Sequence, residues 1–358
     1  MLYLKSILDG RFMSDHNIYM PFVSVIVVNY NNTQLTCQCL ESLLCQDYTS
    51  IEIILVDNGS ENEIEQTVMN KFLNIRFFKL ENNQGYAGGN NAGISVAKGE
   101  YIALINNDAI ASKGWITNMV KTIKEDDSIG AVASVIIDGN NPIVLDSYGV
   151  GVALDGMSRQ RMHGLPLPLE SKKVEIFMPS GCACLIRRKV LDEVGLFDED
   201  YFAYCEDTDL FLRIRWAGYR MVIVPDAQVT HYYSCTGGKF SLNKIYWVER
   251  NHYWVALKNF PLGILILMPF VTLWRLLLQI YSLMIDNKSI NGFLETSSAW
   301  MVIKTIIKAN IEVFVSIPYV INKRIILSRK HKLSSFDMIK QLWVYRMSMR
   351  EIILGLDY

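Results

Sequence analysis

The chain of 358 residues is longer than one typical domain, so we expect one large domain with an appendage. A net charge of −1 gives no indication of a nucleic-acid partner, and a hydrophobic content of 51% is slightly high for a purely soluble enzyme. The seven cysteines include no C-x-x-C pair, the spacing that indicates zinc, so we expect reduced thiols. Charged residues at Lys5, Asp9 and Arg11 interrupt the apolar N-terminus, so we predict no signal peptide and a catalytic part in the cytoplasm.

Residues 1–21 show little periodicity and are expected to form an extension. Residues 22–240 alternate apolar strands with amphipathic helices, which predicts an α/β domain with a mostly parallel sheet flanked by helices. The strands are expected at residues 23–29, 51–56, 75–80, 101–106, 131–137, 177–186 and 220–224, and the helices at 33–46, 61–72, 88–98, 112–125, 187–193 and 206–217. Thr33 is the expected N-cap of the first helix. Residues 138–175, rich in glycine and proline, are expected to form a loop and hairpin, and residues 241–358 a helical region.

Polar residues follow two of the predicted strands at the point where each strand ends. Residues 57–60 read Asp-Asn-Gly-Ser, and residues 106–108 read Asn-Asn-Asp. Because ligands bind beyond the carboxyl ends of strands in open α/β sheets, we expect both acids to point into one crevice. An acidic run at residues 206–209 and a histidine at 231 follow. Together they indicate a metal-assisted reaction on a nucleotide-linked substrate.

These clusters resemble, in the same order, motifs of the family 2 inverting glycosyltransferases. The closest branch contains the bacterial rhamnosyl- and galactofuranosyltransferases, and the resemblance covers residues 22–260. The segments that carry it are residues 23–31, 57–60, 83–93, 107–109, 195–199 and 204–210. The resemblance implies a GT-A-like fold and a nucleotide-diphosphate donor such as dTDP-rhamnose or a UDP-sugar. It also implies that the acceptor is a hydroxyl of a lipid-linked or growing cell-surface glycan.

The resemblance assigns the acidic run at the start of a helix to catalysis. Inverting transfer to a hydroxyl requires one general base and no second nucleophilic carboxylate. By the family motif, Asp207 is that base. Glu206 and Asp209 are expected to contact the acceptor or orient the loop, and Gly181 lies in a small-residue strand beside the acceptor. The preference of acids for the first turn of a helix would by itself explain any one of these carboxylates.

The donor is expected to bind at the first three strands. The resemblance gives Asp57 the role of accepting from the N3–H of a pyrimidine base, although an acid before Gly59 also suits a turn. The same base pocket would be lined by Asn29, Tyr30 and Asn31. A glycine-rich loop opening the helix at 88–98 is expected to offer N–H groups to phosphate. Its predicted contacts are Gly85, Gly88 and Asn90, and a dinucleotide-binding loop is the rival interpretation.

A divalent cation, Mn²⁺ or Mg²⁺, is the expected cofactor. Asp108 takes the place of the last acid in the D-x-D motif of this fold, and Asn106 replaces the first. Asn107 is expected to contact the donor, and His231 to complete the metal site, although a lone histidine is more often structural. Arg250 is expected to reach the diphosphate because a guanidinium matches phosphate geometry, with a solvated charge as the alternative.

Two apolar segments, residues 261–284 and 299–321, predict contact with a membrane surface. Each carries polar positions at four-residue spacing, which is typical of helices that lie in the interface. These positions are Arg275, Gln279, Lys304, Lys308 and Glu312. A basic cluster at residues 323–332 favours the cytoplasmic face of the membrane. A two-span hairpin and a buried soluble bundle remain as alternatives.

Two other classes of function are compatible with parts of this pattern. A non-catalytic nucleotide-sugar-binding module would explain the donor residues without a base. A nicotinamide-dependent oxidoreductase would explain a glycine-rich loop in an α/β domain.

Overall fold

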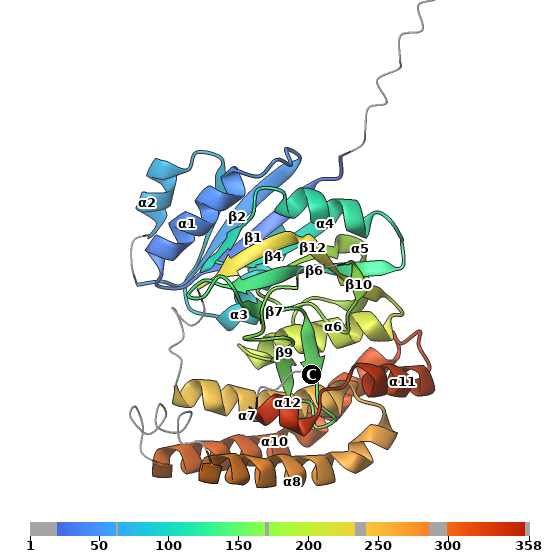
Figure 1. Cartoon of the computed structure of the whole chain (residues 1–358). Coiled ribbons are helices and arrows are strands. Elements are labelled where there is room, and N and C mark those ends of the chain that lie inside the picture. Colours follow the sequence, from blue (N-terminus) through green and yellow to red (C-terminus); the bar gives the residue numbers. More distant parts are fainter. Residues whose placement is uncertain (1–19, 62–63, 169–171, 233–240, 286–298, 355–358) are drawn as a thin grey trace, which may run out of the picture.

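The computed structural model describes residues 20–61, 64–168, 172–232, 241–285 and 299–354 (Figure 1). The predicted N-terminal extension therefore lies almost entirely outside the described residues. A mixed sheet with the strand order β10-β12-β6-β11-β4-β1-β2-β3 forms the centre. Its first half is parallel and comprises β1 (Val23–Asn29), β2 (Ile51–Asn58), β3 (Ile75–Leu80) and β4 (Tyr101–Asn106). These four strands match the expected positions closely.

The second half of the sheet is mixed, because β11 runs antiparallel to both β4 and β6. The remaining strands are β5 (Ala109–Ala111), β6 (Ile129–Asp138), β7 (Leu145–Ser147), β8 (Val150–Val152), β9 (Ser158–Gln160), β10 (Val174–Glu175), β11 (Ala183–Arg187) and β12 (Arg220–His231). β8 and β9 form a separate hairpin inside the predicted insertion. β12 continues well beyond the predicted residue 224, across a bulge between Val224 and Gln228, and ends at His231.

Helices cover both faces of the sheet. They are α1 (Thr33–Leu44), α2 (Ile64–Lys71), α3 (Gly85–Val96), α4 (Trp115–Ile123), α5 (Arg188–Val194), the 3₁₀ turn η1 (Glu199–Tyr201) and α6 (Glu206–Trp216). Alternate side chains of β1 enter two cores: Val25 packs with α1, α2 and α4, and Ile26 packs with α3 and α6. The N-cap of α1 is Asn32 rather than Thr33, because the Asn32 side chain accepts from the N–H of Leu35.

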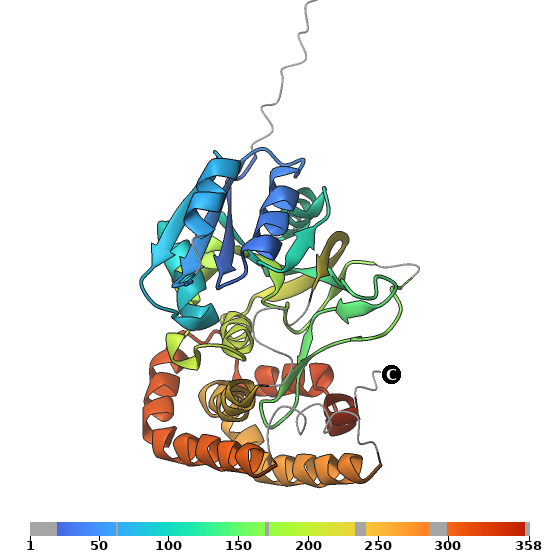
Figure 2. The ribbon, with the colours of Figure 1, turned by 90° about the vertical axis from the view of Figure 1, so that its left-hand side faces the viewer.

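The C-terminal region is helical, as expected, and packs beneath α6. It comprises α7 (Leu242–Asn259), α8 (Leu262–Ile285), α10 (Ala299–Ser328), α11 (Ser335–Tyr345) and α12 (Met349–Leu354). Two perpendicular views show α7 next to α6, with α8 and α10 forming the outermost layer (Figures 1 and 2). Among the described residues, no helix has both the length and the hydropathy needed to cross a bilayer.

Two of the five polar positions expected at the membrane interface face the interior of the protein instead. Arg275 of α8 is fully buried, and its guanidinium pairs with Asp155 (2.9 Å) and Glu249 (3.1 Å). Glu312 of α10 likewise faces inward to Arg250, at 3.0 Å. Arg275 and Glu312 therefore contact the protein itself, because their charged partners lie on α7 and in the hairpin, whereas Lys304 and Lys308 are exposed. The outer faces expose many large apolar side chains. Their most exposed large residues include Leu262, Ile266, Phe270, Trp300, Phe314 and Val315.

Replacing Arg275 by alanine should lower the free energy of unfolding by about 3–5 kcal/mol, because the fully buried Asp155 carboxylate would lose its partner. Urea unfolding followed by circular dichroism measures the loss. Leu273→Ala, on the exposed face of the same helix, is the control and should change stability by less than about 0.5 kcal/mol. Equal losses in the two variants would show that the ion pair does not hold α8.

Candidate active site

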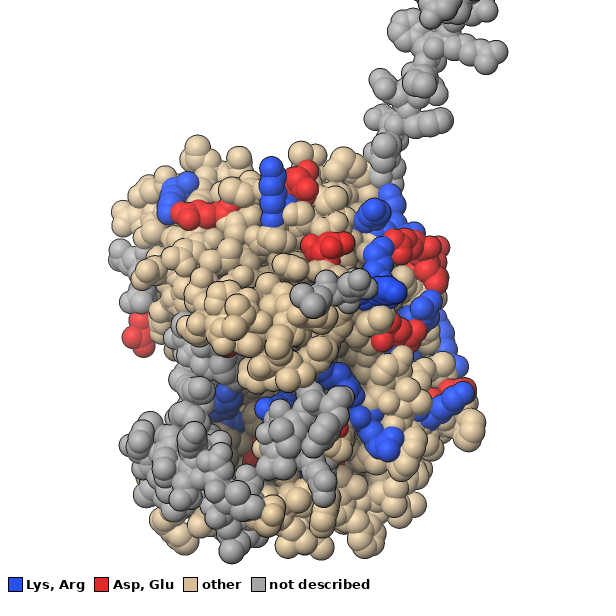
Figure 3. Space-filling model, in the orientation of Figure 1, with Lys and Arg blue, Asp and Glu red and all other residues tan. Residues whose placement is uncertain are grey.

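A cavity of about 740 Å³ opens between the sheet and α7, a size typical of ligand pockets. Figure 3 shows the hollow between the sheet domain above and the helical layer below, with lysine and arginine on its walls. The ends of β1 and β4 contribute Tyr30 and Asn107, and α7 contributes Lys244 and Trp247. Residues from both sides of the predicted boundary near 240 therefore form one cavity.

Of the two acids expected to point into one crevice, Asp108 lines the cavity and Asp57 does not, although their strands end side by side with β1 between them. In the parallel register, Asn29 at the end of β1 lies opposite Asp57 of β2, and Val28 lies opposite Asn106 of β4. The ends of β2 and β4 therefore flank the end of β1. Asp108 follows directly after β4 and lines the cavity.

His231 joins Asp108 because of strand pairing. As the last residue of β12 it pairs with Ala109 of β5, which brings its Nε2 to 3.2 Å from Asp108 Oδ1. Its Nδ1 lies 2.8 Å from Asp146 Oδ2, on β7. Asp146 was not predicted, since nothing in its sequence context marks it. Burial would raise its pKa, yet hydrogen bonds from His163 and His231 lower the pKa of Asp146 to about 2.

This group fits a divalent cation that also binds the donor. Asp108 Oδ1 is buried, and in the described part of the chain it has the His231 ring at 3.2 Å beside it but no well-aligned hydrogen bond. A carboxylate on the far nitrogen of a metal-binding histidine, as Asp146 provides here, is the usual arrangement around such ligands. Within the described ranges no three His, Cys, Asp or Glu side chains group to hold a metal on their own. The remaining ligands would therefore have to come from a diphosphate and water.

Asp207 lies half-buried in the cavity wall at the start of α6. Its Oδ2 accepts from the N–H of Gly181 (3.1 Å), and its Oδ1 accepts from the N–H of Thr208 (2.7 Å). Burial raises the pKa of Asp207 although these donors oppose the rise. The neighbouring Glu206 is buried, and burial together with Asp207 raises its pKa well above the ordinary value. The site thus pairs an oriented carboxylate with a carboxyl group that favours its protonated form.

The predicted base pocket is partly formed by the expected residues. Asp57 is fully buried; its Oδ1 accepts from Asn29 Nδ2 at 3.1 Å, and its Oδ2 has no partner among the described residues. Tyr30 lines the cavity. Asn29 is buried and does not line the cavity, and its Oδ1 accepts from Asn107 (3.3 Å). Asn31 is exposed, and its N–H donates to the Ser60 hydroxyl.

The glycine-rich loop serves packing more than anion binding. The N–H of Gly85 donates to Asn83 Oδ1 (2.8 Å), and the N–H of Gly88 donates to the Gln84 carbonyl (3.3 Å). The groups expected to bind phosphate therefore already have partners. Gly85 has φ +71°, and a Cβ there would lie 2.2 Å from the Phe202 carbonyl oxygen, so only glycine fits. Asn90 does line the cavity.

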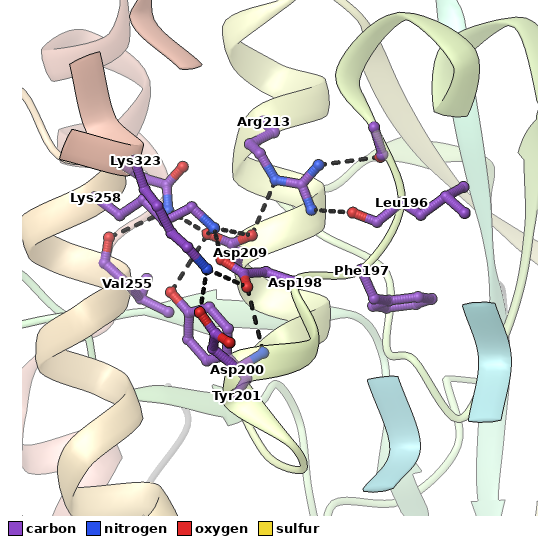
Figure 4. A network of polar contacts seen from close by, with 12 residues as sticks. Leu196, Phe197, Asp198, Asp200, Tyr201, Asp209, Arg213, Val255, Lys258 and Lys323 are labelled. Atoms are coloured by element: carbon purple, nitrogen blue, oxygen red, sulfur yellow. Dashed lines mark hydrogen bonds and ion pairs between the residues drawn. The ribbon is translucent and has the colours of Figure 1, made fainter. Parts of the chain in front are cut away.

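Two expected site residues are braces rather than ligand contacts. Asp209 is fully buried and pairs with Arg213 and Lys258, each at 2.9 Å, which lower its pKa against the effect of burial (Figure 4). Arg250 donates to Glu312 and to the carbonyl oxygens of Asp200 and Tyr201. Neither Asp209 nor Arg250 lines the cavity. The acceptor contact expected of Asp209 and the diphosphate contact expected of Arg250 therefore find no support in this geometry. The alternative role of Asp209, orienting the loop, stays a prediction, and its hydrogen bond from the Tyr201 hydroxyl suits that role.

The loop before α6 was missed by sequence reasoning. Phe202, Tyr204 and Cys205 have φ of +63°, +68° and +67°. Such positive φ values are usually predicted from glycines, and none of these three residues is a glycine. The Asn251 amide of α7 holds this loop by donating to the carbonyls of Tyr201, Ala203 and Tyr204 at 2.7–3.0 Å. The helical C-terminal region thereby fixes the segment that leads to Asp207.

Comparisons with known proteins agree with this geometry. A family model described as glycosyl transferase family 2 matches residues 24–195. The chain is 30% identical over 217 residues to an uncharacterized glycosyltransferase, YwdF, of Bacillus subtilis (strain 168), covering 60% of this chain and 75% of the relative. It is 26% identical over 241 residues to an N-acetylglucosaminyl-diphospho-decaprenol L-rhamnosyltransferase of Mycobacterium tuberculosis (strain CDC 1551 / Oshkosh), covering 60% and 77%.

Among solved structures, GalNAc-T7 with UDP, GalNAc and Mn²⁺ aligns with a TM-score of 0.54 at 19% identity, covering 66% of this chain and 48% of that one. This likeness supports the GT-A fold. The family model and the relatives show that the protein is a glycosyltransferase. The nicotinamide-dependent oxidoreductase and the non-catalytic binding module are therefore rejected as interpretations. The chain belongs to glycosyltransferase family 2.

Proposed function

We propose that this protein is an inverting transferase that moves a sugar from a nucleotide-diphosphate donor to a hydroxyl of a lipid-linked or growing cell-surface glycan. The observation that carries the proposal is the position of Asp207 in a cavity that also contains Asp108 and His231. The Asp207 carboxylate can accept the proton of an acceptor hydroxyl. Asp108 and His231 can bind a cation that also binds the diphosphate. The mycobacterial relative, whose name describes a lipid-diphosphate acceptor and the transfer of L-rhamnose, supports the class of acceptor. A dTDP-rhamnose-like sugar or a UDP-sugar is the proposed donor.

Asp207 is proposed to act as the general base. It would take the proton of the acceptor hydroxyl as that oxygen bonds to the anomeric carbon from the side opposite the leaving diphosphate. The N–H groups of Gly181 and Thr208 fix the direction of its carboxylate. A raised pKa makes it a stronger base. Glu206, which favours its protonated form, would donate a hydrogen bond to the acceptor.

The donor is proposed to bind along the sheet edge. The unpaired, buried Oδ2 of Asp57 would accept from the N3–H of a pyrimidine base, with Tyr30 beside it. Asp108 and His231 would hold a divalent cation. When bound, the cation supplies positive charge to the leaving diphosphate. Asp146 keeps the His231 ring oriented through Nδ1.

We also propose that the enzyme works at the cytoplasmic face of the cell membrane. The outer faces of α8 and α10 expose many large apolar side chains, while Arg275 and Glu312 pair inside the protein. Lys304 and Lys308 of α10 are exposed cations beside them. Within the basic cluster, Lys323 pairs with Asp198 and Lys332 pairs with Glu193, whereas Arg329 and Lys330 remain exposed. Exposed apolar side chains next to such cations suit an anionic lipid surface.

Replacing Asp207 by asparagine should lower turnover roughly 100-fold or more without weakening donor binding. The asparagine side chain keeps the shape of the aspartate side chain but cannot accept the proton of the acceptor hydroxyl. A screen of UDP-, GDP- and dTDP-sugars with Mn²⁺, followed by nucleotide release, identifies the donor for this measurement. In the unmodified enzyme, kcat/KM should fall as the pH drops through the raised pKa of Asp207. Asp226→Asn, at an exposed position, is the control. Near-normal turnover of Asp207→Asn would remove this residue from the role of base.

Removal of divalent cations with EDTA should abolish activity, and Mn²⁺ should restore it at least as well as Mg²⁺, because an imidazole is among the proposed ligands. His231→Ala should weaken the binding of Mn²⁺ in the presence of donor nucleotide, measured by electron paramagnetic resonance. His331→Ala is the control, since His331 stacks on Trp216 and does not line the cavity. Full activity in excess chelator would instead make Asp108 a contact for a sugar hydroxyl.

The full chain should sediment with vesicles of phosphatidylcholine and phosphatidylglycerol. Phe270 and Phe314 are 71% and 76% exposed on the outer faces of α8 and α10. Changing both to glutamate should lower the partition coefficient roughly 10-fold or more, since burying one phenyl ring contributes about 1.5–3 kcal/mol. Leu73→Glu, at a 91% exposed position beyond α2, is the matched control and should have no effect. Equal sedimentation of the two variants would argue against this membrane face.

A further inference from the structure

Three aromatic rings form a wall of the cavity next to the general base. Phe202 and Tyr204 come from the loop before α6, and Trp247 comes from α7. The ring centroids of Phe202 and Trp247 are 4.8 Å apart at an interplanar angle of 32°. Those of Tyr204 and Trp247 are 6.4 Å apart at 30°. All three rings are partly exposed to the cavity, whereas the neighbouring Tyr201 is fully buried in the core.

The loop holds its rings in place at a cost to the backbone. A non-glycine residue with φ near +65° is strained, and Phe202 and Tyr204 both adopt this conformation. Such strain persists only where the surroundings enforce it. Here the Asn251 amide binds the carbonyls of Ala203 and Tyr204, and the N–H of Ala87 donates to the Phe202 carbonyl (3.2 Å). The rings are therefore pre-positioned before any ligand arrives.

The chemistry of such a wall matches a sugar ring. A pyranose carries C–H groups on its faces, and these carry partial positive charge. Aromatic faces are electron-rich and attract them, and tryptophan and tyrosine offer large, rigid contact area at a low entropic cost. The wall is formed by α7 and the loop before α6, whereas Asp57 lies at the end of β2 and Asp108 follows β4. The rings therefore come from other elements than the residues proposed to contact the nucleobase and the diphosphate of the donor.

We propose that Phe202, Tyr204 and Trp247 form an acceptor subsite on which a sugar ring stacks beside Asp207. This inference rests on the proposed function and narrows its substrate class. An acceptor that presents a sugar here already carries at least one glycosyl unit. The enzyme would then lengthen an existing glycan rather than attach the first sugar to a lipid phosphate.

The test measures binding of methyl glycosides of N-acetylglucosamine, glucose, galactose and rhamnose to the full chain by saturation-transfer NMR. At least one glycoside should bind in the millimolar range. Trp247→Leu should weaken that binding roughly tenfold or more, while Trp247→Phe should retain most of it. Trp343→Leu, at an exposed position of α11 outside the cavity, is the control. If Trp247→Leu does not fold, Tyr204→Leu carries the same expectation.

Two results would overturn the subsite: no glycoside binds the unmodified protein, or binding is unchanged in Trp247→Leu or its substitute. Nucleotide binding by the unmodified protein is measured on the same samples. Loss of nucleotide binding with intact glycoside binding would contradict the proposed function alone. Nucleotide binding without glycoside binding would contradict the aromatic subsite alone.

Discussion

The arrangement of this site depends on a buried network of charges around the start of α6. Asp209 is bound by Arg213 of its own helix and by Lys258 of α7 (Figure 4). Lys258 also pairs with Asp198 at 2.6 Å, and Asp198 pairs in turn with Lys323 of α10. One set of ion pairs thus joins α6, α7 and α10 to the loop between α5 and η1. Because Asp207 lies two residues before Asp209, this network fixes the backbone that carries the proposed base.

Buried ion pairs are a weak source of stability by themselves, because desolvation offsets much of their attraction. Polar contacts of this kind matter here because they fix the direction of the backbone. The loop from Phe202 to Cys205 is strained, and an apolar contact would not dictate its backbone direction. The Asn251 amide and the Arg250 guanidinium bind individual carbonyl oxygens and so select one conformation. Loss of these bonds would relax the loop, and Asp207 would lose its alignment even if the fold survived.

The sequence predicted the features that depend on local patterns. The strands β1 to β4 and the acids that follow them could be located because apolar runs and the ends of parallel strands obey simple rules. Asp146 could not be found, because it reaches His231 only through the pairing of β7 with β6 and of β6 with β12. The ion pair of Asp209 could not be predicted for the same reason, since its partner Lys258 is 49 residues away in another helix.

The orientation of α8 and α10 shows a second limit of pattern reasoning. Periodic polar residues identify one face of a helix but do not tell whether water or protein covers that face. Here Arg275 and Glu312 find partners inside, so the apolar face turns outward. The same inward charges connect this outer face to the loop at Phe202, because Arg250 contacts both Glu312 and the carbonyl of Tyr201. A lipid surface bound by α8 and α10 would therefore lie one helix layer away from the acceptor wall formed by Trp247. An acceptor anchored in that surface would have a short path to Asp207.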